Sequence, residues 1–254
     1  MSMATELKRS GSDFLSAIQF LTRIPMPSVG YRTDSLSGAV KFFPLVGALI
    51  GGMAALLNRY LANHLPRLVS AFLIVLFLVL ITGGIHEDGL ADAADGFGGG
   101  HTREKILLIL RDSRIGSYGA AALCLSLVGR LVLISSMPAD HCVKYLIVAN
   151  VLCRWTVLPL SYFLPPARES EGQGARIARL TTRFSLIAGT IFAFALTGAL
   201  LRWQAFVPLA VAILTTFLSG RFYSRKIGGI TGDCFGATTQ ATEITIYLCG
   251  VWAV

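Results

Sequence analysis

The chain has 254 residues, of which 54% are hydrophobic and only 14% are charged. Because soluble domains carry about 25% charged residues, a lipid bilayer is the simpler solvent for this composition. The net charge of +8 would suit nucleic acid, but the basic residues follow the distribution that membrane topology predicts, so we expect no nucleic-acid partner. None of the five cysteines forms a Cys-x-x-Cys pair, which argues against a disulfide framework or a zinc site.

The N-terminal segment Phe14–Ile24 is apolar but short, and Arg23 interrupts it. No small-residue cleavage site follows, as a signal peptide would require. This segment predicts an amphipathic helix lying at the membrane interface.

Seven later segments are apolar enough to form spanning helices, which need roughly 17–25 such residues. The sequence therefore predicts an all-α, polytopic transmembrane helical bundle that forms one domain over residues 1–254. The predicted spans are 40–58, 67–85, 117–137, 143–164, 184–201, 204–220 and 235–254.

The basic residues set the predicted orientation. Under the seven-span scheme, most of the 22 Lys and Arg residues lie on the side of the N-terminus. Because cytoplasmic loops carry an excess of Lys and Arg, this side faces the cytoplasm. The polar segments 84–116, 165–183 and 221–234 gather there, so we expect a multi-pass protein of the cytoplasmic (inner) membrane whose active site faces the cytoplasm. The opposite side holds only Arg59, Arg67, Lys144 and Arg202.

An acidic motif follows the second predicted span. On a helix, Asp92 and Asp95 lie about 40° and about 20° to either side of Asp88, so the three carboxylates share one stripe. Such crowding near a bilayer calls for a compensating cation, and Mg²⁺ prefers carboxylate oxygens together with substrate phosphates. The alternative is a set of solvated loop acids, but the many flanking glycines and alanines favour close packing around a phosphorylated ligand.

Other polar residues lie near this motif. His86 is a candidate general base, or else a polar residue that ends a span. Arg111, Asp112 and Arg114 suit phosphate recognition, because a guanidinium group binds phosphate oxygens in pairs; topological charge at a helix end is the alternative.

Two further segments carry candidate residues. Arg154 and Glu243 fall inside predicted spans, where they form an ion pair or line a substrate cavity. The glycine-rich run 228–240 leads into the last span, so its backbone amides, with Thr231, could bind phosphate. Asp233 could add a further metal ligand.

Taken together, the motifs resemble the cobalamin synthase family over nearly the whole chain. The matching runs are H-x-D-G-L-A-D-x-x-D-G at 86–96, D-S-R-I-G-x-Y-G at 112–119 and G-G-I-T-G-D-x-x-G-A at 228–237, with Glu243. Residues 17–25 and 43–47 also match. Glu87 departs from the pattern, which usually has an apolar residue there; we expect its added negative charge to alter metal affinity.

The resemblance implies a transferase that joins adenosylcobinamide-GDP to α-ribazole or its 5′-phosphate and releases GMP. It also implies a requirement for Mg²⁺, held by Asp88, Asp92 and Asp95. Catalytic roles would fall to His86, Asp88, Asp92 and Arg114. Surrounding membrane lipid, association with other late cobalamin-pathway enzymes and a homo-oligomeric state are further expectations.

Two alternatives belong to other families. A membrane CDP-alcohol phosphotransferase also uses spaced aspartates and Mg²⁺, but its motif, Asp-x-x-Asp-Gly-x-x-Ala-Arg followed by Gly-x-x-x-Asp-x-x-x-Asp, is missing from this chain. A cation transporter would use carboxylates together with Arg154, yet the acids here cluster at the end of a span rather than at its middle.

Overall fold

The computed structural model of the chain describes residues 3–26, 38–168, 177 and 181–252. Within these ranges the regular elements are all helices, and one isolated β-bridge joins Pro166 to Ile230, which confirms the all-α class. The elements are α1 (Met3–Leu21), η1 (Val40–Phe42), α3 (Phe43–Leu61), α4 (Arg67–Thr82), α5 (Ile85–Gly99), α6 (Arg103–Ile109), α7 (Ser117–Ser136), α8 (Ala139–Trp155), α9 (Val157–Phe163), α11 (Arg183–Leu201), η2 (Arg202–Ala205), α12 (Phe206–Ile227) and α13 (Gly232–Trp252).

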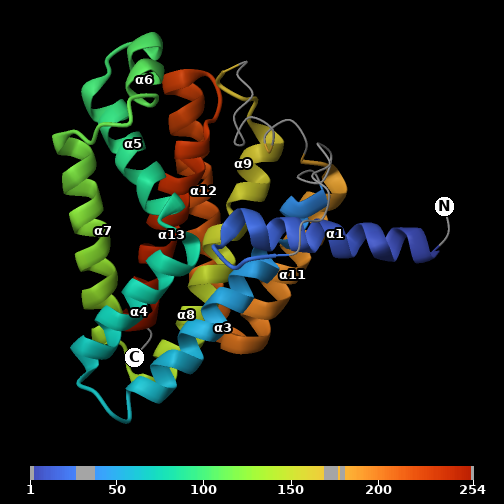
Figure 1. Ribbon diagram of the computed structural model, residues 1–254, viewed down its shortest axis with the longest axis vertical. Helices are drawn as coiled ribbons and strands as arrows, with labels where there is room; N and C mark the ends of the chain where they lie inside the picture. Colours follow the sequence, from blue (N-terminus) through green and yellow to red (C-terminus); the bar gives the residue numbers. More distant parts are fainter. Residues whose placement is uncertain (1–2, 27–37, 169–176, 178–180, 253–254) are drawn as a thin grey trace.

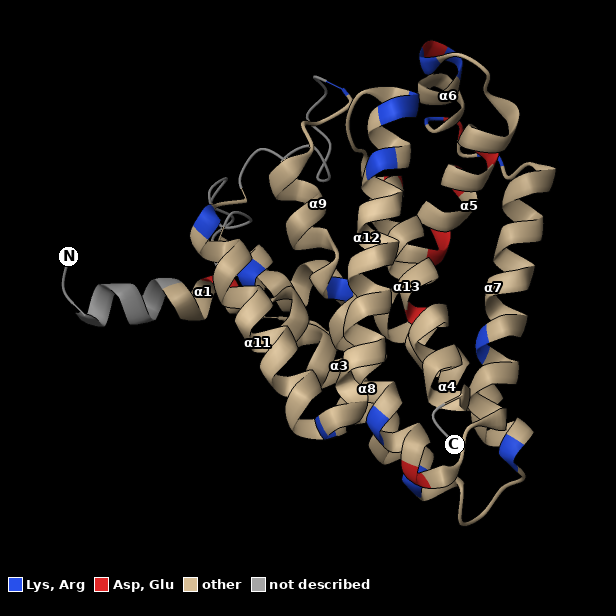
Figure 2. Ribbon diagram, turned by 180° about the vertical axis from the view of Figure 1, so that it is seen from behind, with Lys and Arg blue, Asp and Glu red and all other residues tan. Residues whose placement is uncertain are grey.

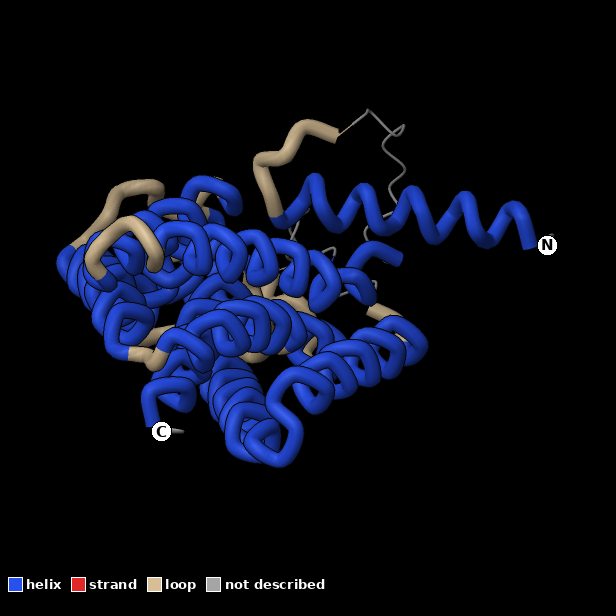
Figure 3. The backbone as a smooth tube through the Cα atoms, turned by 90° about the horizontal axis from the view of Figure 1, so that it is seen from below, coloured by secondary structure: helices blue, strands red, loops and turns tan. Residues whose placement is uncertain are grey.

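The long helices form a bundle in which α5, α7, α12 and α13 run close to the long axis of the molecule (Figure 1). Helix α1 leaves this bundle sideways, and its N-terminal end stands clear of the other helices (Figure 3). The predicted interfacial segment is therefore part of a longer helix of 19 residues. Its position at the membrane interface stays a prediction.

The predicted count of seven spans is not confirmed. By length and composition, four helical runs of the described chain could cross a membrane: Val40–Leu61, Ser117–Ser136, Ala139–Phe163 and Arg183–Ile227. The last run has 45 residues and contains both α11 and α12, separated by η2. Helix α13 coincides with the last predicted span but is not one of the four, because threonines, Gln240 and Glu243 dilute its apolar surface.

A sharp bend separates α4 from α5. Gly83 and Gly84 both adopt left-handed backbone angles, with φ of 68° and 73°, which glycine tolerates because it has no Cβ. The helix axes consequently meet at 88°. Helix α4 reaches the apolar length of a span only together with α5, making a fifth crossing at most, and α5 with four acidic residues in 15 is not itself a span.

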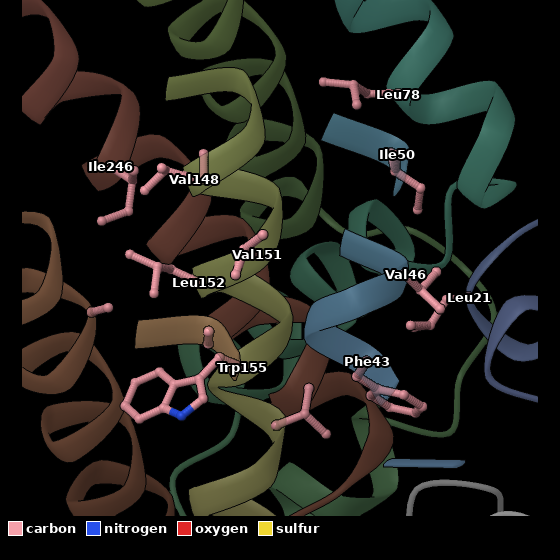
Figure 4. Packing of buried hydrophobic residues seen from close by; sticks show 14 of the residues in the cluster. Leu21, Phe43, Val46, Ile50, Leu78, Val148, Val151, Leu152, Trp155 and Ile246 are labelled. Carbon is pink, nitrogen blue, oxygen red and sulfur yellow. The ribbon is translucent and has the colours of Figure 1, made fainter. Parts of the chain in front are cut away.

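The apolar core is centred on the crossing of α3 and α8. Figure 4 shows Val46 and Ile50 on the side of α3 away from α8, where Val46 lies beside Leu21 of α1 and Ile50 lies on the side of Leu78 of α4. Glycines bring these two helices close together. A Cβ added at Gly51 would lie 2.6 Å from the carbonyl oxygen of Leu146, so this position has no room for a larger residue.

Substitution of neighbouring glycines tests this packing. We expect Gly51→Ala to lower the free energy of unfolding by roughly 1–3 kcal/mol, because backbone atoms must move apart. Gly52→Ala is the matched control, since a Cβ there meets nothing within 4 Å and alanine favours helix by about 1 kcal/mol. Thermal unfolding of the two variants in detergent measures the difference. Equal melting temperatures would contradict the α3–α8 contact.

Candidate active site

The site is built where α5 crosses α13. A Cβ added at Gly89 would lie 3.1 Å from the backbone oxygen of Asp233 and 3.1 Å from the Cα of Gly236. Conversely, a Cβ at Gly236 would lie 3.0 Å from the Cα of Gly89. The two glycines therefore let the backbones approach closely. As a result, Asp88 on α5 lies close enough to Asp233 on α13 for their charges to interact.

A first cavity, the acidic chamber, opens on the α7 side of α5 and has a volume of about 670 Å³. Asp88 and Asp92 line it, and Arg23, at the end of α1, brings a positive charge to the same wall. Glu87 of α5 and Ser113, in the loop before α7, add to the polar lining. Figure 2 shows the acidic residues following α5, with basic residues gathered around α6 and the nearby end of α12.

A second cavity, the aromatic chamber, lies on the α13 side of α5 and has a volume of about 150 Å³. Its apolar wall includes the rings of Phe20, Phe43 and Phe235, which come from α1, α3 and α13. The rings of Phe20 and Phe43 stack with centroids 5.6 Å apart. His86, Asp88 and Asp233 form its polar wall. Asp88 therefore borders both chambers.

The carboxylates raise one another's pKa values. Burial, followed by the charges of Asp88, Asp233 and Asp95, raises the pKa of Asp92 to about 6. Burial also raises the pKa of Asp233, although a hydrogen bond from Thr231 and the charge of Arg168 oppose this effect. The site thus concentrates negative charge that the described residues only partly neutralise.

No group of three His, Cys, Asp or Glu side chains in the described chain is placed to hold a metal ion by itself. The predicted stripe of Asp88, Asp92 and Asp95 is therefore not a complete cage. Asp95 has a different setting, because its carboxylate accepts hydrogen bonds from the backbone amides of Gly116 (2.7 Å) and Gly119 (2.9 Å). It caps the start of α7, where a negative charge is favourable. A metal role for Asp95 stays a prediction.

The predicted phosphate-binding residues lie at the rim. Arg114 is exposed and donates paired hydrogen bonds to Asp112, which hold the pKa of Asp112 at about 2. Arg111 is also exposed. Neither arginine lines a chamber, although Ser113 between them does. Thr231 is buried and donates to the Asp233 carboxylate at 3.1 Å, so it orients that group.

A buried charge network lies behind the site. Arg130 of α7 donates to Glu87 at 2.7 Å and pairs with Glu243 of α13 at 3.6 Å. Glu87 also accepts from Gln240 at 3.3 Å, and Tyr247 donates to Glu243 at 2.9 Å. Glu87, the departure from the family pattern, thus lines the acidic chamber and is paired with the network behind it.

The predicted pairing of Arg154 with Glu243 is wrong for the described residues. Arg154 instead donates to the backbone and side-chain oxygens of Asn150, at 3.1 and 2.8 Å. Sequence indicates how deep a residue lies along a helix, but the partner depends on how each helix is rotated, and Glu243 faces α7. Neither residue lines the two chambers, so their predicted contact with substrate has no support from this geometry.

His86 occupies the second position of α5 and is only 9% exposed. Burial, together with the charges of Arg154 and Arg130, lowers the pKa of its imidazole well below the usual value. Its Nε2 has no hydrogen-bond partner among the described residues. The imidazole is therefore neutral and a weak base, and its free ring nitrogen can accept a hydrogen bond; a role for His86 as general base stays a prediction.

Three positions that the motifs did not identify help to build the site. Arg23 lines the acidic chamber, Arg130 neutralises the buried acids, and Arg168 interacts with Asp233. The sequence carried one usable signal, because Arg130 stands inside a predicted span, where an ionised group needs a partner. Arg23 falls within the matching run 17–25 but is assigned no role there, and Arg168 resembles an ordinary topological charge in the sequence.

Fold and site together define a class: a multi-pass helical membrane protein with an acidic site bordered by two chambers. The comparisons then identify the family. Residues 13–251 match the family model described as Cobalamin-5-phosphate synthase, and the chain belongs to that family. This result agrees with the motif resemblance and supports neither the CDP-alcohol phosphotransferase nor the cation transporter.

Several relatives are similar over almost their full length, and each carries the name adenosylcobinamide-GDP ribazoletransferase. The protein from Sinorhizobium medicae is 42% identical, covering 95% of this chain and 97% of the relative. That from Azorhizobium caulinodans is 39% identical, covering 94% and 95%. That from Ralstonia nicotianae is 36% identical, covering 96% of both. No solved structure matches the chain.

Removal of the buried cation tests the network. We expect Arg130→Met to lower the free energy of unfolding by roughly 3–5 kcal/mol, because Glu87 and Glu243 then lose their counter-charge. Adding Glu87→Met should recover part of the loss, since it removes one uncompensated charge. Arg59→Met, at an exposed arginine, is the control. Chemical unfolding in detergent gives the double-mutant cycle, and additive effects would contradict the pairing.

The raised pKa of Asp92 predicts a pH dependence in metal-free protein. The unfolded carboxyl titrates near 4, so between about pH 4 and 6 the unfolded chain loses a proton that the folded chain keeps. Stability should therefore fall as the pH rises through this range. Thermal unfolding in chelator at pH 4.5 and 6.5 measures the fall in melting temperature, which should be smaller in Asp92→Asn. The same fall in both proteins would contradict the interaction.

Proposed function

We propose that this protein is an Mg²⁺-dependent adenosylcobinamide-GDP ribazoletransferase of the cytoplasmic membrane. The observation that carries the proposal is the position of Asp88, which borders both chambers within a chain that belongs to the Cobalamin-5-phosphate synthase family. A transferase with two substrates needs such a meeting point. The late step of cobalamin biosynthesis named for the relatives supplies two substrates of suitable chemistry.

The reaction is a phosphoryl transfer. A hydroxyl group of α-ribazole, or of its 5′-phosphate, attacks the phosphorus that is bonded to cobinamide. The bond from this phosphorus to the bridging oxygen breaks, and GMP leaves with that oxygen. Catalysis of this kind depends mainly on positioning and on neutralising charge at the phosphoryl oxygens.

The carboxylates fit a magnesium site that substrate completes. Asp88 and Asp92 would hold the ion, with Asp233 close by. The pKa of Asp92 is raised first by burial and then by its acidic neighbours, and a cation would relieve the repulsion among these carboxylates. Because Mg²⁺ usually takes one or two carboxylates together with waters and substrate phosphates, a preformed cage of three is unnecessary. The bound ion would neutralise negative charge on the diphosphate.

Other residues have separate roles in this proposal. His86, neutral and with a free ring nitrogen, accepts the hydroxyl proton. Arg23 lines the acidic chamber and faces the diphosphate, which makes it a binding residue in addition to those predicted. Arg114 and Arg111 act from the rim, where Arg114 must exchange Asp112 for substrate phosphate.

The site faces the cytoplasm in this proposal. Basic residues cluster around α6 and the neighbouring end of α12, as the positive-inside rule requires of a cytoplasmic surface (Figure 2). A homo-oligomeric state and association with other late cobalamin-pathway enzymes stay predictions.

The activity is tested by GMP release from adenosylcobinamide-GDP in the presence of α-ribazole and Mg²⁺. We expect Asp92→Asn to reduce turnover by at least about 100-fold, because the diphosphate charge is then poorly neutralised. Glu104→Gln, at an exposed acid of α6, is the control and should retain full turnover. Normal turnover by Asp92→Asn would contradict its role, and absence of release by the wild-type protein would contradict the activity.

Binding of the ion can be measured without turnover. Mg²⁺ should raise the melting temperature of the wild-type protein at pH 7.5, because it relieves repulsion among the carboxylates. The increase should be smaller in Asp92→Asn and unchanged in Glu104→Gln. An equal increase in all three proteins would place the ion elsewhere.

A further inference from the structure

The two chambers differ in chemistry as well as in position. The aromatic chamber, on the α13 side of α5, is small and mainly apolar, with three phenylalanine rings in its wall. The acidic chamber, on the α7 side, is more than four times larger and carries Arg23, Asp88 and Asp92. The two cavities adjoin along α5, because Phe20, Ile85 and Asp88 line both, and their different chemistry suits different ligands.

From these features we propose that the aromatic chamber binds the heteroaromatic base of the attacking nucleoside, and that the acidic chamber binds the nucleoside diphosphate donor. This assignment rests on the proposed function and gives each substrate its own subsite. It names Phe235 and Val157 as residues that select the base.

The size and lining of the aromatic chamber support its assignment to the base of the nucleoside. Its volume is about 150 Å³, and an apolar cavity of about that size in another protein binds benzene. Phe20 and Phe43 already stack with an interplanar angle of 11°, so a flat ring can extend the stack. Val157 of α9 and Phe235 of α13 are buried side chains of the same wall and limit the size of that ring.

The polar wall supports the position of the sugar. His86 lines the chamber, is nine-tenths buried and has an Nε2 atom without a hydrogen-bond partner in the described chain. An unpaired buried nitrogen is costly, and a ribose hydroxyl at this wall would satisfy it. With the base against the phenylalanines, the sugar hydroxyls lie towards His86 and Asp88.

The geometry of the reaction supports the assignment of the acidic chamber to the diphosphate donor. In phosphoryl transfer the attacking and leaving oxygens lie on opposite sides of the phosphorus, roughly in line. A nucleoside entering from the α13 side and a diphosphate held on the α7 side meet at Asp88, which borders both chambers. The acidic chamber, with about 670 Å³, has the room that the larger donor needs.

Steady-state kinetics with both substrates varied tests the assignment. Val157→Phe fills the aromatic chamber, so kcat/KM for α-ribazole should fall by about 10-fold or more, as pocket contacts of this size discriminate. The KM for adenosylcobinamide-GDP should not change. For a riboside of imidazole, whose base has one ring, kcat/KM should fall much less than for α-ribazole. General damage to the fold would lower kcat/KM for both ribosides alike.

Two further variants complete the design. Phe235→Leu, a milder change at the same wall, should raise the KM for α-ribazole alone, and it keeps the test available if Val157→Phe does not fold. Val128→Phe is the matched control, because Val128 lies on the outer face of α7 with 55% of its surface exposed. It should leave both KM values as in the wild-type protein.

Equilibrium dialysis of labelled α-ribazole against detergent-solubilised protein measures base binding without turnover. Weaker binding in Val157→Phe and Phe235→Leu, but not in Val128→Phe, supports the assignment. A rise in the KM for adenosylcobinamide-GDP with unchanged α-ribazole binding would overturn it and exchange the two subsites. Wild-type protein that binds α-ribazole but releases no GMP would contradict the proposed function, while the binding comparison still decides the base subsite.

Discussion

The close contact between α5 and α13 is the constraint on which the rest of the structure depends. Gly89 and Gly236 face each other across it, and a Cβ at either position would press against the backbone of the other helix, at 3.1 and 3.0 Å. Their contact brings Asp88 near Asp233 and leaves a separate cavity on each side of α5. Larger residues here would force the helices apart, separate the carboxylates and merge the cavities.

The buried acids behind the α5–α13 contact and the acids at the chambers differ in how their charge is compensated. Beneath α5, Arg130 neutralises Glu87 and Glu243 inside the protein, where an unpaired charge would be costly. At the chambers, Asp88 and Asp92 have only partial compensation, and burial followed by the neighbouring carboxylates raises the pKa of Asp92. A buried ion-pair network thus lies behind a site whose carboxylates are only partly compensated.

The bend at Gly83 and Gly84 explains why the acidic residues are accessible. A straight continuation of α4 would carry them further along the direction of that helix. The 88° turn instead lays α5 between α7 and α13, with its acidic side towards the chambers. Asp95, at the far end of α5, then caps α7 and fixes the loop that carries Ser113 to the acidic chamber.

The sequence by itself determined the membrane class, the all-helical fold, the family and the acidic motif, because composition and motif spacing are local properties of the chain. It also indicated that Arg154 and Glu243 lie deep in the protein. Only the tertiary structure decided that Glu243 pairs with Arg130, that Asp95 caps a helix and that Arg23 reaches the site. These contacts depend on how each helix is rotated about its axis and which neighbour it meets, and residue spacing along one helix does not specify either.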